Sequence, residues 1–507
     1  MRRIIYRRNA MFYHFYNEDI MQKSIGELLS MLEAGTLSSE ELVWAYAERI
    51  AALDQAEDGP KLHAVRELNP DAFQIARERD WERRTGKIRG PLHGIPVLLK
   101  DTIDTKDKMR TTCGAASMRD HHAAEDAFIV KKLRDAGAII LGKNYCSELY
   151  GFNALEKPNG YSSLLNGSTK NPFGPEKLIP GGSSGGSAVS VAADMAAAAV
   201  GTDTAGSILE PAYMNAVVGY KPTVGLTSRS GILPVMMCQD AAGPITRTVA
   251  DAARIADVII GRDEADPDTI RAEAFQEGSF LDGIEEESLN GKRIGIVKEG
   301  YYARMSGTAR LLTESALDKL RLSGARIVEV ENFLPAKILD APNQNPERLN
   351  YEVMNRAFKV RFDHYLSSQS DLPFHSLKEL IEWNETHPEN IPLGQDYLKL
   401  VEELGDDAVM SPLFTASRMN DLDICGTRGV WGAMEYYRLD VLILPGLDAQ
   451  GIAATAGNPT ITIPAGMTRE SGPVGITLVG ELMGDRELLR IARACEKVLP
   501  KRPVPEI

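Results

Sequence analysis

The sequence predicts an α/β fold, and its pattern of alternating strand and helix candidates carries that prediction. Between about residues 90 and 250, apolar runs such as "IPVLLK" and "GAIILGK" alternate with helical stretches such as "DAFIVKKLRDAGA". After an acidic stretch from Glu264 to Asn290, "KRIGIVK", a helix through Leu320 and "ARIVEVE" repeat the same order. Three strand candidates, "LDVLILPG", "PTITIPAG" and "PVGITLVGE", precede a final helix, "DRELLRIARACEKVL".

The first residues differ from the rest. Residues 1–20 carry four arginines but lack the continuous apolar run of a secretory signal, and we interpret them as a ragged leader. Apolar spacing then predicts two short helices, separated at Gly35, with Ser38 or Ser39 capping the second. No window approaches 18 uninterrupted apolar residues, so no membrane span is expected.

One interrupted domain over residues 21–507 is the most economical organisation. Residues 90–250, here called the signature region, hold the sequence motifs, and residues 335–430, here called the helical region, are polar, helical and irregular. Neither the acidic stretch nor the helical region has enough apolar residues for a core of its own.

The amino-acid composition limits the classes of function that the protein can have. A formal net charge of −14 argues against a nucleic-acid surface and favours a small neutral or weakly polar substrate. The five cysteines are scattered and lack CxxC spacing, which indicates neither a disulfide framework nor a zinc site and favours a reducing cytoplasm.

The stretch "IPGGSSGGSAVSVAAD", residues 179–194, is open to several interpretations. A flexible linker is disfavoured because a thirteen-residue helix candidate, "SAVSVAADMAAAA", begins inside it. A phosphate loop needs a lysine, and none lies between Lys177 and Lys221. A nucleophile elbow centred on Ser183 or Ser184 needs a preceding strand and a histidine base. However, "NPFGPEKLIP" predicts no strand, and the three downstream histidines all fall in the helical region, so a Ser-Asp-His triad is disfavoured.

A serine nucleophile with a lysine base remains. Lys100 ends a strand candidate with apolar flanks, and burial there would lower the pKa of its ammonium toward neutrality. The alternative is a surface lysine paired with Asp101. Further along, Ser207 follows a turn of small residues, in which the backbone N–H groups of Thr204, Ala205 and Gly206 can point at one oxygen.

Three motifs in this order resemble the amidase signature family. They are "GIPVLLKD", the run from "GGSSGGS" to "GTDTAGS", and "VVGYKPTVGL". Through "GPLHGIPVLLKD", "LRDAGAIILGK" and "KPTVGLTSRSGILP", the chain looks most similar to the bacterial peptide amidase branch. The resemblance implies a large mixed, twisted sheet with helices on both faces, and a metal-free, cofactor-free enzyme.

The resemblance also implies roles for individual residues. Ser207 is the nucleophile, Ser183 is a bridging serine after a cis peptide bond from Gly182, and Lys100 is the base that ends the proton relay. The N–H groups of Thr204, Ala205, Gly206 and Ser207 form the oxyanion hole. The segment "SELYGF" borders the acyl channel in relatives, which nominates Leu149, Tyr150 and Phe152, although ordinary core packing explains them equally well.

Two positions depart from the family pattern. Leu209 stands where many family members carry arginine, so we expect Asp203 to lack its usual cationic partner. Ala205 stands where glycine is frequent, so a positive φ there would cost on the order of 1 kcal/mol.

The expected function is hydrolysis of a linear amide, a C-terminal peptide amide or a small acyl or aryl amide, through an acyl-enzyme. The alternatives are the glutaminase subunit of a tRNA-dependent amidotransferase and a non-catalytic scaffold of the same fold. We expect a small-molecule or peptide amide as the binding partner, no nucleic acid or membrane, and a monomer or homodimer.

Overall fold

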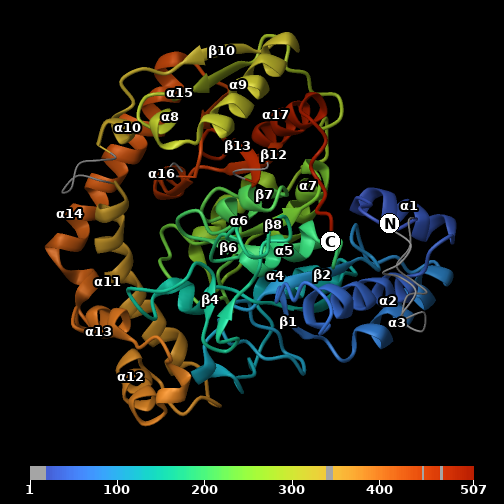
Figure 1. The fold of residues 1–507 in the computed structure, drawn as a ribbon, viewed down its shortest axis with the longest axis vertical. Helices are drawn as coiled ribbons and strands as arrows, with labels where there is room; N and C mark the ends of the chain where they lie inside the picture. The colour runs from blue at the N-terminus through green and yellow to red at the C-terminus, as the bar shows by residue number, and fades with distance from the viewer. Residues whose placement is uncertain (1–18, 339–345, 448–449, 469–471) are drawn as a thin grey trace.

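A mixed sheet of 11 strands runs through the described part of the chain (Figure 1). The computed structural model describes residues 19–338, 346–447, 450–468 and 472–507. The strand order is β1 (Val65–Leu68), β3 (Ile139–Asn144), β2 (Pro96–Lys100), β6 (Ala198–Asp203), β8 (Ala241–Thr246), β7 (Val218–Lys221), β12 (Thr460–Thr468), β13 (Gly472–Val479), β11 (Val441–Leu444), β9 (Arg293–Ile296) and β10 (Arg326–Glu329). A separate pair joins β4 (Tyr161–Ser162) to β5 (Gly167–Ser168).

Both parallel and antiparallel pairs occur in the large sheet. Strand β2 runs parallel to β3 and β6, and β9 runs parallel to β10 and β11. The strands between them, from β6 to β11, pair antiparallel. Every residue of β2, β6 and β11 is buried, so other elements cover both faces of the sheet there. The predicted α/β class and the large mixed sheet are therefore confirmed.

The two helices expected near the start are α1 (Ile25–Ala34) and α2 (Ser39–Ile50). Each begins with a capping box, in which the N-cap serine and a glutamate three residues later bond to each other's backbone N–H. The cap of α2 is Ser38, and α1 ends at Gly35 in the left-handed conformation.

The remaining helices fall between or after the strands. Outside the helical region they are α3 (Ala72–Arg84), α4 (Phe128–Asp135), α5 (Gly185–Ala192), α6 (Leu209–Met214), α7 (Val249–Ile259), α8 (Tyr301–Arg304), α9 (Gly307–Leu322), α15 (Trp431–Tyr437), α16 (Gln450–Ala456) and α17 (Asp485–Val498). Short 3-10 or π segments are η2 (Ala51–Gln55), η3 (Ala116–Met118), η4 (Glu148–Gly151), η5 (Pro267–Phe275), η6 (Pro388–Asn390), η7 (Ala408–Met410) and η8 (Leu422–Val430).

The predicted thirteen-residue helix after the Gly/Ser stretch is wrong in length. Helix α5 ends at Ala192, and β6 already begins at Ala198. Between them Asp194 adopts a positive φ of 61° and pairs with Arg247, with 3.0 Å between Oδ1 and Nη1. A continuous Ala/Val run suits a buried helix and a buried strand equally, so periodicity could not locate the change.

The helical region contains α10 (Leu334–Ile338), α11 (Pro346–Ser367), α12 (Leu377–Thr386), α13 (Asp396–Glu402) and α14 (Pro412–Asp421). Helices α11 to α14 lie on the opposite side of the molecule from α1 to α3 (Figure 1). Their buried apolar side chains, among them Phe358 and Phe362, form one cluster with Leu149, Phe152 and Leu233 of the signature region. The helical region thus completes its packing against the signature region.

The predicted leader, residues 1–20, lies almost entirely outside the described residues. Of its two described residues, Ile20 is 2% exposed and belongs to the core cluster that contains α1 and α2. The ordered core therefore includes at least one residue that the sequence assigned to the leader.

Candidate active site

Lys100 ends strand β2 and is completely buried. Its Nζ donates to Ser183 Oγ at 2.6 Å, to Thr202 Oγ1 at 2.8 Å and to the Thr202 carbonyl at 3.3 Å. The ring of Tyr150 lies 4.8 Å from the same nitrogen. The alternative interpretation of Lys100 as a surface lysine is therefore wrong, because its side chain is completely buried and bonds to Ser183 and Thr202.

Burial lowers the pKa of Lys100 to about 8, since an ammonium loses its hydration inside the protein. Nearby acidic groups partly oppose this shift: the thiols of Cys146 and Cys113 and the carboxylates of Asp203 and Asp240. Burial also raises the pKa of Cys113 well above its usual value, so this thiol stays protonated beside the lysine. Near neutral pH a usable fraction of Lys100 is neutral and can accept a proton.

Ser183 and Ser184 occupy the loop before α5. The peptide bond between Gly182 and Ser183 is cis, as the resemblance implies. Ser183 is 3% exposed, and its carbonyl accepts from the Ser147 N–H at 3.1 Å. Ser184 is fully buried, and its Oγ donates to the Thr202 carbonyl at 3.1 Å. Its hydroxyl thus bonds to the strand backbone, whereas that of Ser183 bonds to Lys100.

The backbone at the start of α5 packs closely against neighbouring backbone carbonyls, and this packing holds the loop in place. A Cβ on Gly186 would come within 2.5 Å of two carbonyl oxygens, those of Ala64 and Tyr145. The first turn of α5 can therefore lie against the end of β3 only with glycine there. The glycines of "GGSSGGS" are thus part of a rigid, packed loop.

Ser207 lies in the turn between β6 and α6 and is partly exposed. Its carbonyl accepts from the Ser184 N–H at 3.2 Å, which joins this turn to the Ser183 loop. In the described residues, no hydrogen bond joins Ser207 Oγ to Ser183 Oγ. Catalytic hydrogen bonds in unliganded enzymes are often long and tighten only with substrate.

One predicted oxyanion donor is already engaged. The Gly206 N–H donates to Asp203 Oδ1 at 2.8 Å, and the Ile208 N–H donates to Asp203 Oδ2 at 2.7 Å. The expectation of a free N–H at Gly206 is therefore corrected, because the Asp203 carboxylate caps this turn. The N–H groups of Thr204, Ala205 and Ser207 have no acceptor within the described part of the chain.

The two departures from the family pattern are accommodated locally. Leu209 is fully buried, and the Asp203 carboxylate is satisfied by backbone N–H groups where a cation was expected. Buried Lys221 also lies close enough for Asp203 to oppose the lowering of its pKa, which burial brings to about 8. The left-handed position of the turn is Gly206, at φ 114°, and Ala205 has no positive φ, so its methyl group carries no such penalty.

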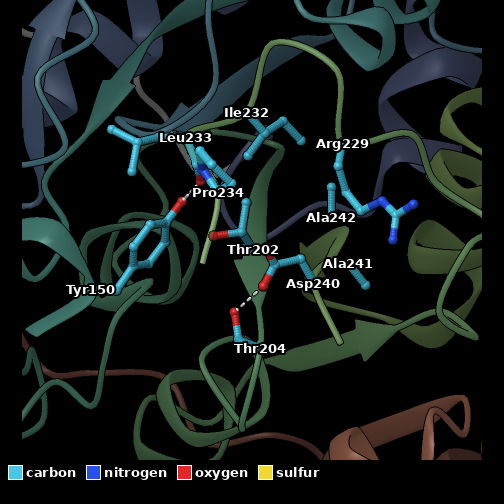
Figure 2. A pocket seen from close by; sticks show the side chains of 10 residues that line it. All are labelled: Tyr150, Thr202, Thr204, Arg229, Ile232, Leu233, Pro234, Asp240, Ala241 and Ala242. Carbon is cyan, nitrogen blue, oxygen red and sulfur yellow. Dashed lines mark hydrogen bonds between the residues drawn. The ribbon is translucent and has the colours of Figure 1, made fainter. Parts of the chain in front are cut away.

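A small cavity lies beside Thr202 and Thr204 (Figure 2). Tyr150 closes one side, and its hydroxyl donates to the Leu233 carbonyl. Asp240 faces Thr204, whose Oγ1 donates to Asp240 Oδ1 at 2.5 Å. The lining is completed by Arg229, Ile232, Pro234, Ala241 and Ala242.

The three nominated channel residues occupy different surroundings. Tyr150 lines the cavity and covers Lys100. Leu149 is 1% exposed and belongs to the apolar cluster shared with the helical region. Phe152 belongs to the same cluster and stacks on Phe358, with ring centroids 4.1 Å apart. Of the three, Tyr150 alone lies against both the cavity and the lysine, and their contact with substrate stays a prediction.

Sequence reasoning missed several residues around the site. Thr202 holds Lys100, Asp240 holds Thr204, and Gln239 donates to the Thr204 carbonyl at 3.0 Å. Thr202 lies in β6, whose first residues were predicted to be helical, so no predicted strand pointed to it. No sequence signal joins Gln239 and Asp240 to the turn, because their loop meets it only in the folded chain.

Two further properties of the described residues bear on other classes of function. They contain no group of three or more His, Cys, Asp or Glu side chains arranged to hold a metal ion. None of their helices is both long and apolar enough to cross a membrane.

Comparisons with known proteins give a consistent picture. The Amidase family model matches residues 41–489. The crystal structure of native peptide amidase from Stenotrophomonas maltophilia superposes with a TM-score of 0.87 at 37% identity, covering 96% of this chain and 99% of that one. A probable amidase of Arabidopsis thaliana is 35% identical over 501 residues, or 96% of this chain and 92% of the relative. A glutamyl-tRNA(Gln) amidotransferase subunit of Thermotoga maritima is 30% identical over 482 residues, covering 88% of this chain and 94% of the relative.

The matching family model spans most of the chain, and the relatives match along nearly their whole length. The chain therefore belongs to the amidase family of hydrolases, which act on amide C–N bonds.

Proposed function

We propose that this protein hydrolyses a linear amide, with C-terminal peptide amides as the first substrate class, through Ser207, Ser183 and Lys100. The observation that carries the proposal is the contact of 2.6 Å between a fully buried Lys100 Nζ and Ser183 Oγ. The loop that bears Ser183 is in turn hydrogen-bonded to Ser207 through the Ser184 N–H. Lys100, Ser183 and the partly exposed Ser207 thus lie on three adjoining segments, which supports the proposal.

The proposed reaction begins with a proton relay. Neutral Lys100 accepts the proton of the Ser183 hydroxyl while Ser183 Oγ accepts that of Ser207. Ser207 Oγ then bonds to the amide carbonyl carbon, and the electron pair of the C=O bond moves to oxygen. The N–H groups of Thr204, Ala205 and Ser207 are the available donors for that oxyanion.

The second half of the reaction returns the proton. As the C–N bond breaks, the relay protonates the leaving nitrogen, and ammonia or an amine departs, leaving an ester on Ser207. Water attacks this ester while the relay removes one of its protons. Cleavage of the ester bond then releases the carboxylic acid and restores the Ser207 hydroxyl.

Peptide amides come first because the chain is 37% identical over nearly its full length to the Stenotrophomonas peptide amidase. The similarity to part of an amidotransferase supports a second candidate, a glutaminase that passes ammonia to a partner. A panel of N-acetyl-phenylalaninamide, benzamide, acetanilide and free glutamine, each tested separately, separates these classes by the carboxylic acid that forms: N-acetyl-phenylalanine, benzoate, acetate or glutamate.

The test combines labelling with turnover. The purified protein is treated with a fluorophosphonate, and intact mass and peptide mapping locate the adduct. We expect one adduct on Ser207, none on Ser207→Ala, and release of ammonia from the peptide amide. Hydrolysis of glutamine alone would favour the glutaminase, and an adduct on Ser184 would contradict the triad. Absence of both adduct and turnover would leave the scaffold interpretation.

A further inference from the structure

Gln239 connects the helical region to the turn that carries Ser207. It is fully buried, and its Nε2 donates to the Thr204 carbonyl at 3.0 Å. Its Oε1 accepts from Arg418 Nη1 at 3.2 Å. A guanidinium only donates and a carbonyl only accepts, so one orientation of the Gln239 amide satisfies both neighbours.

The bond to Thr204 also determines where an oxyanion donor points. The Thr204 carbonyl and the Ala205 N–H belong to one planar peptide group, which is trans, so they point in opposite directions. Holding the carbonyl toward Gln239 therefore aims the Ala205 N–H away from it. Ala205 is exposed, and its N–H has no acceptor within the described residues, two positions before Ser207.

Arg418 holds Gln239 from a distant part of the chain. It lies in α14 of the helical region, and its Nη1 also donates to the Thr455 carbonyl of α16 at 3.0 Å. The guanidinium thus joins α14, α16 and the Gln239 loop at one point. The side chain of Thr204 is held separately by Asp240.

We propose that Arg418 and Gln239 are positioning residues that orient the Ala205 N–H as an oxyanion donor. This inference rests on the proposed function, because the donor matters only if Ser207 attacks a carbonyl. It gives the helical region a second role besides packing against the signature region, namely the assembly of the catalytic turn.

The test uses Arg418→Met, Gln239→Met and the double variant. Methionine keeps most of the apolar stem of each side chain while removing its polar end. Arg428→Met is the matched control, since Arg428 is exposed in neighbouring η8 and pairs with Asp423. Thermal unfolding verifies that each variant is folded before two measurements are made.

The first measurement is the rate at which a fluorophosphonate labels Ser207, because negative charge develops on the phosphoryl oxygen during that reaction. Loss of a complete oxyanion donor costs about 10² to 10³-fold, so loosening one should slow labelling about tenfold. The double variant should be slowed about tenfold as well, because both changes break the same connection. Arg428→Met should react at the wild-type rate.

The second measurement is amide hydrogen exchange in the peptide containing residues 203–208, whose Gly206 and Ile208 N–H groups are protected by Asp203 and report on the order of the turn. It needs no enzyme activity. We expect faster exchange in Arg418→Met and Gln239→Met and no change in the control. Unchanged exchange and labelling in folded single variants, or slowing that multiplies in the double variant, would overturn the inference. A different outcome is also informative: both variants exchange faster, but no fluorophosphonate labels even the wild-type protein. That result would support the positioning role and count against the proposed function.

Discussion

The signature region and the helical region use their buried side chains differently. In the signature region, Lys100, Ser183 and Thr202 are buried polar groups that satisfy one another within 2.8 Å. In the helical region most buried side chains are apolar, and they include the stack of Phe358 on Phe362, with 4.9 Å between ring centroids. The hydrogen bonds of the signature region hold reactive groups in position, whereas the apolar packing of the helical region holds its helices together. Arg418 and Gln239 form a polar connection between the helical region and the catalytic turn.

The largest effect should come from Lys100→Met. General-base catalysis contributes about 10² to 10⁴-fold, and we expect labelling of Ser207 by a fluorophosphonate to slow by that factor. Lys143→Met is the matched control, because Lys143 is also a fully buried lysine but donates to the Ile103 carbonyl and Thr111. A folded Lys143→Met that loses as much activity as Lys100→Met would mean that burial of charge, not base chemistry, explains the loss.

Within the signature region, variants of the adjacent residues Ser183 and Ser184 test which hydroxyl takes part in the proton relay. Ser183→Ala removes the group that Lys100 contacts and should slow labelling about 10² to 10³-fold. Ser184→Ala removes a hydroxyl bonded to the strand backbone, so the rate should stay within about tenfold while stability falls by about 1 kcal/mol. The two rates are compared directly, and equal losses would contradict the assignment of Ser183 as the bridge.

The pH dependence of labelling tests the state of Lys100. Its pKa is lowered to about 8, and only the neutral amine accepts a proton. Below pH 8 the rate should therefore rise about tenfold per pH unit and level off above it. A stopped assay from about pH 6 to 9 on wild type and Lys100→Met measures this. A flat wild-type profile, or the same rise in the variant, would assign the titration to another group.

The smallest effect on chemistry should come from Phe358→Ala. Removing a fully buried phenylalanine typically costs about 3 to 5 kcal/mol, so calorimetry should show a lower unfolding temperature. Labelling of the folded protein should stay within about threefold, since Phe358 packs on Phe152 and not on the triad. Leu413→Ala on α14, 52% exposed, is the control and should change stability by no more than about 0.5 kcal/mol. A hundredfold slower rate in folded Phe358→Ala would remove the distinction between the two regions.

Sequence reasoning succeeded where neighbouring residues supply the information. The strand around "IPVLLK", a helix cap at Ser38 or Ser39, which the structure places at Ser38, and the end of α1 at Gly35 follow from local pattern and turn chemistry. The apolar flanks of Lys100 were compatible with a buried strand end or with a surface turn, and the structure decided for the buried position; its contact with Ser183 was implied by the family resemblance.

The errors have a common physical origin. Helix α5 ends two residues before Asp194, whose ion pair with Arg247 joins residues far apart in the chain. The engagement of the Gly206 N–H depended on how the Asp203 side chain folds back over the turn. The contact between Gln239 and Arg418 spans 179 positions, and neither residue stands in a motif. Each depends on tertiary structure that the local sequence does not encode.

The pairing of β7 with β12 has a consequence for synthesis on the ribosome. Strand β7 ends at Lys221, but its partner β12 begins only at Thr460, so the middle of the sheet cannot close until the chain has been made beyond residue 460. Until then β7 presents an open, apolar edge, the kind of surface that pairs with other nascent chains. Slow translation or premature termination before residue 460 should therefore yield aggregates, and a chaperone that shields this edge should raise the yield of folded protein.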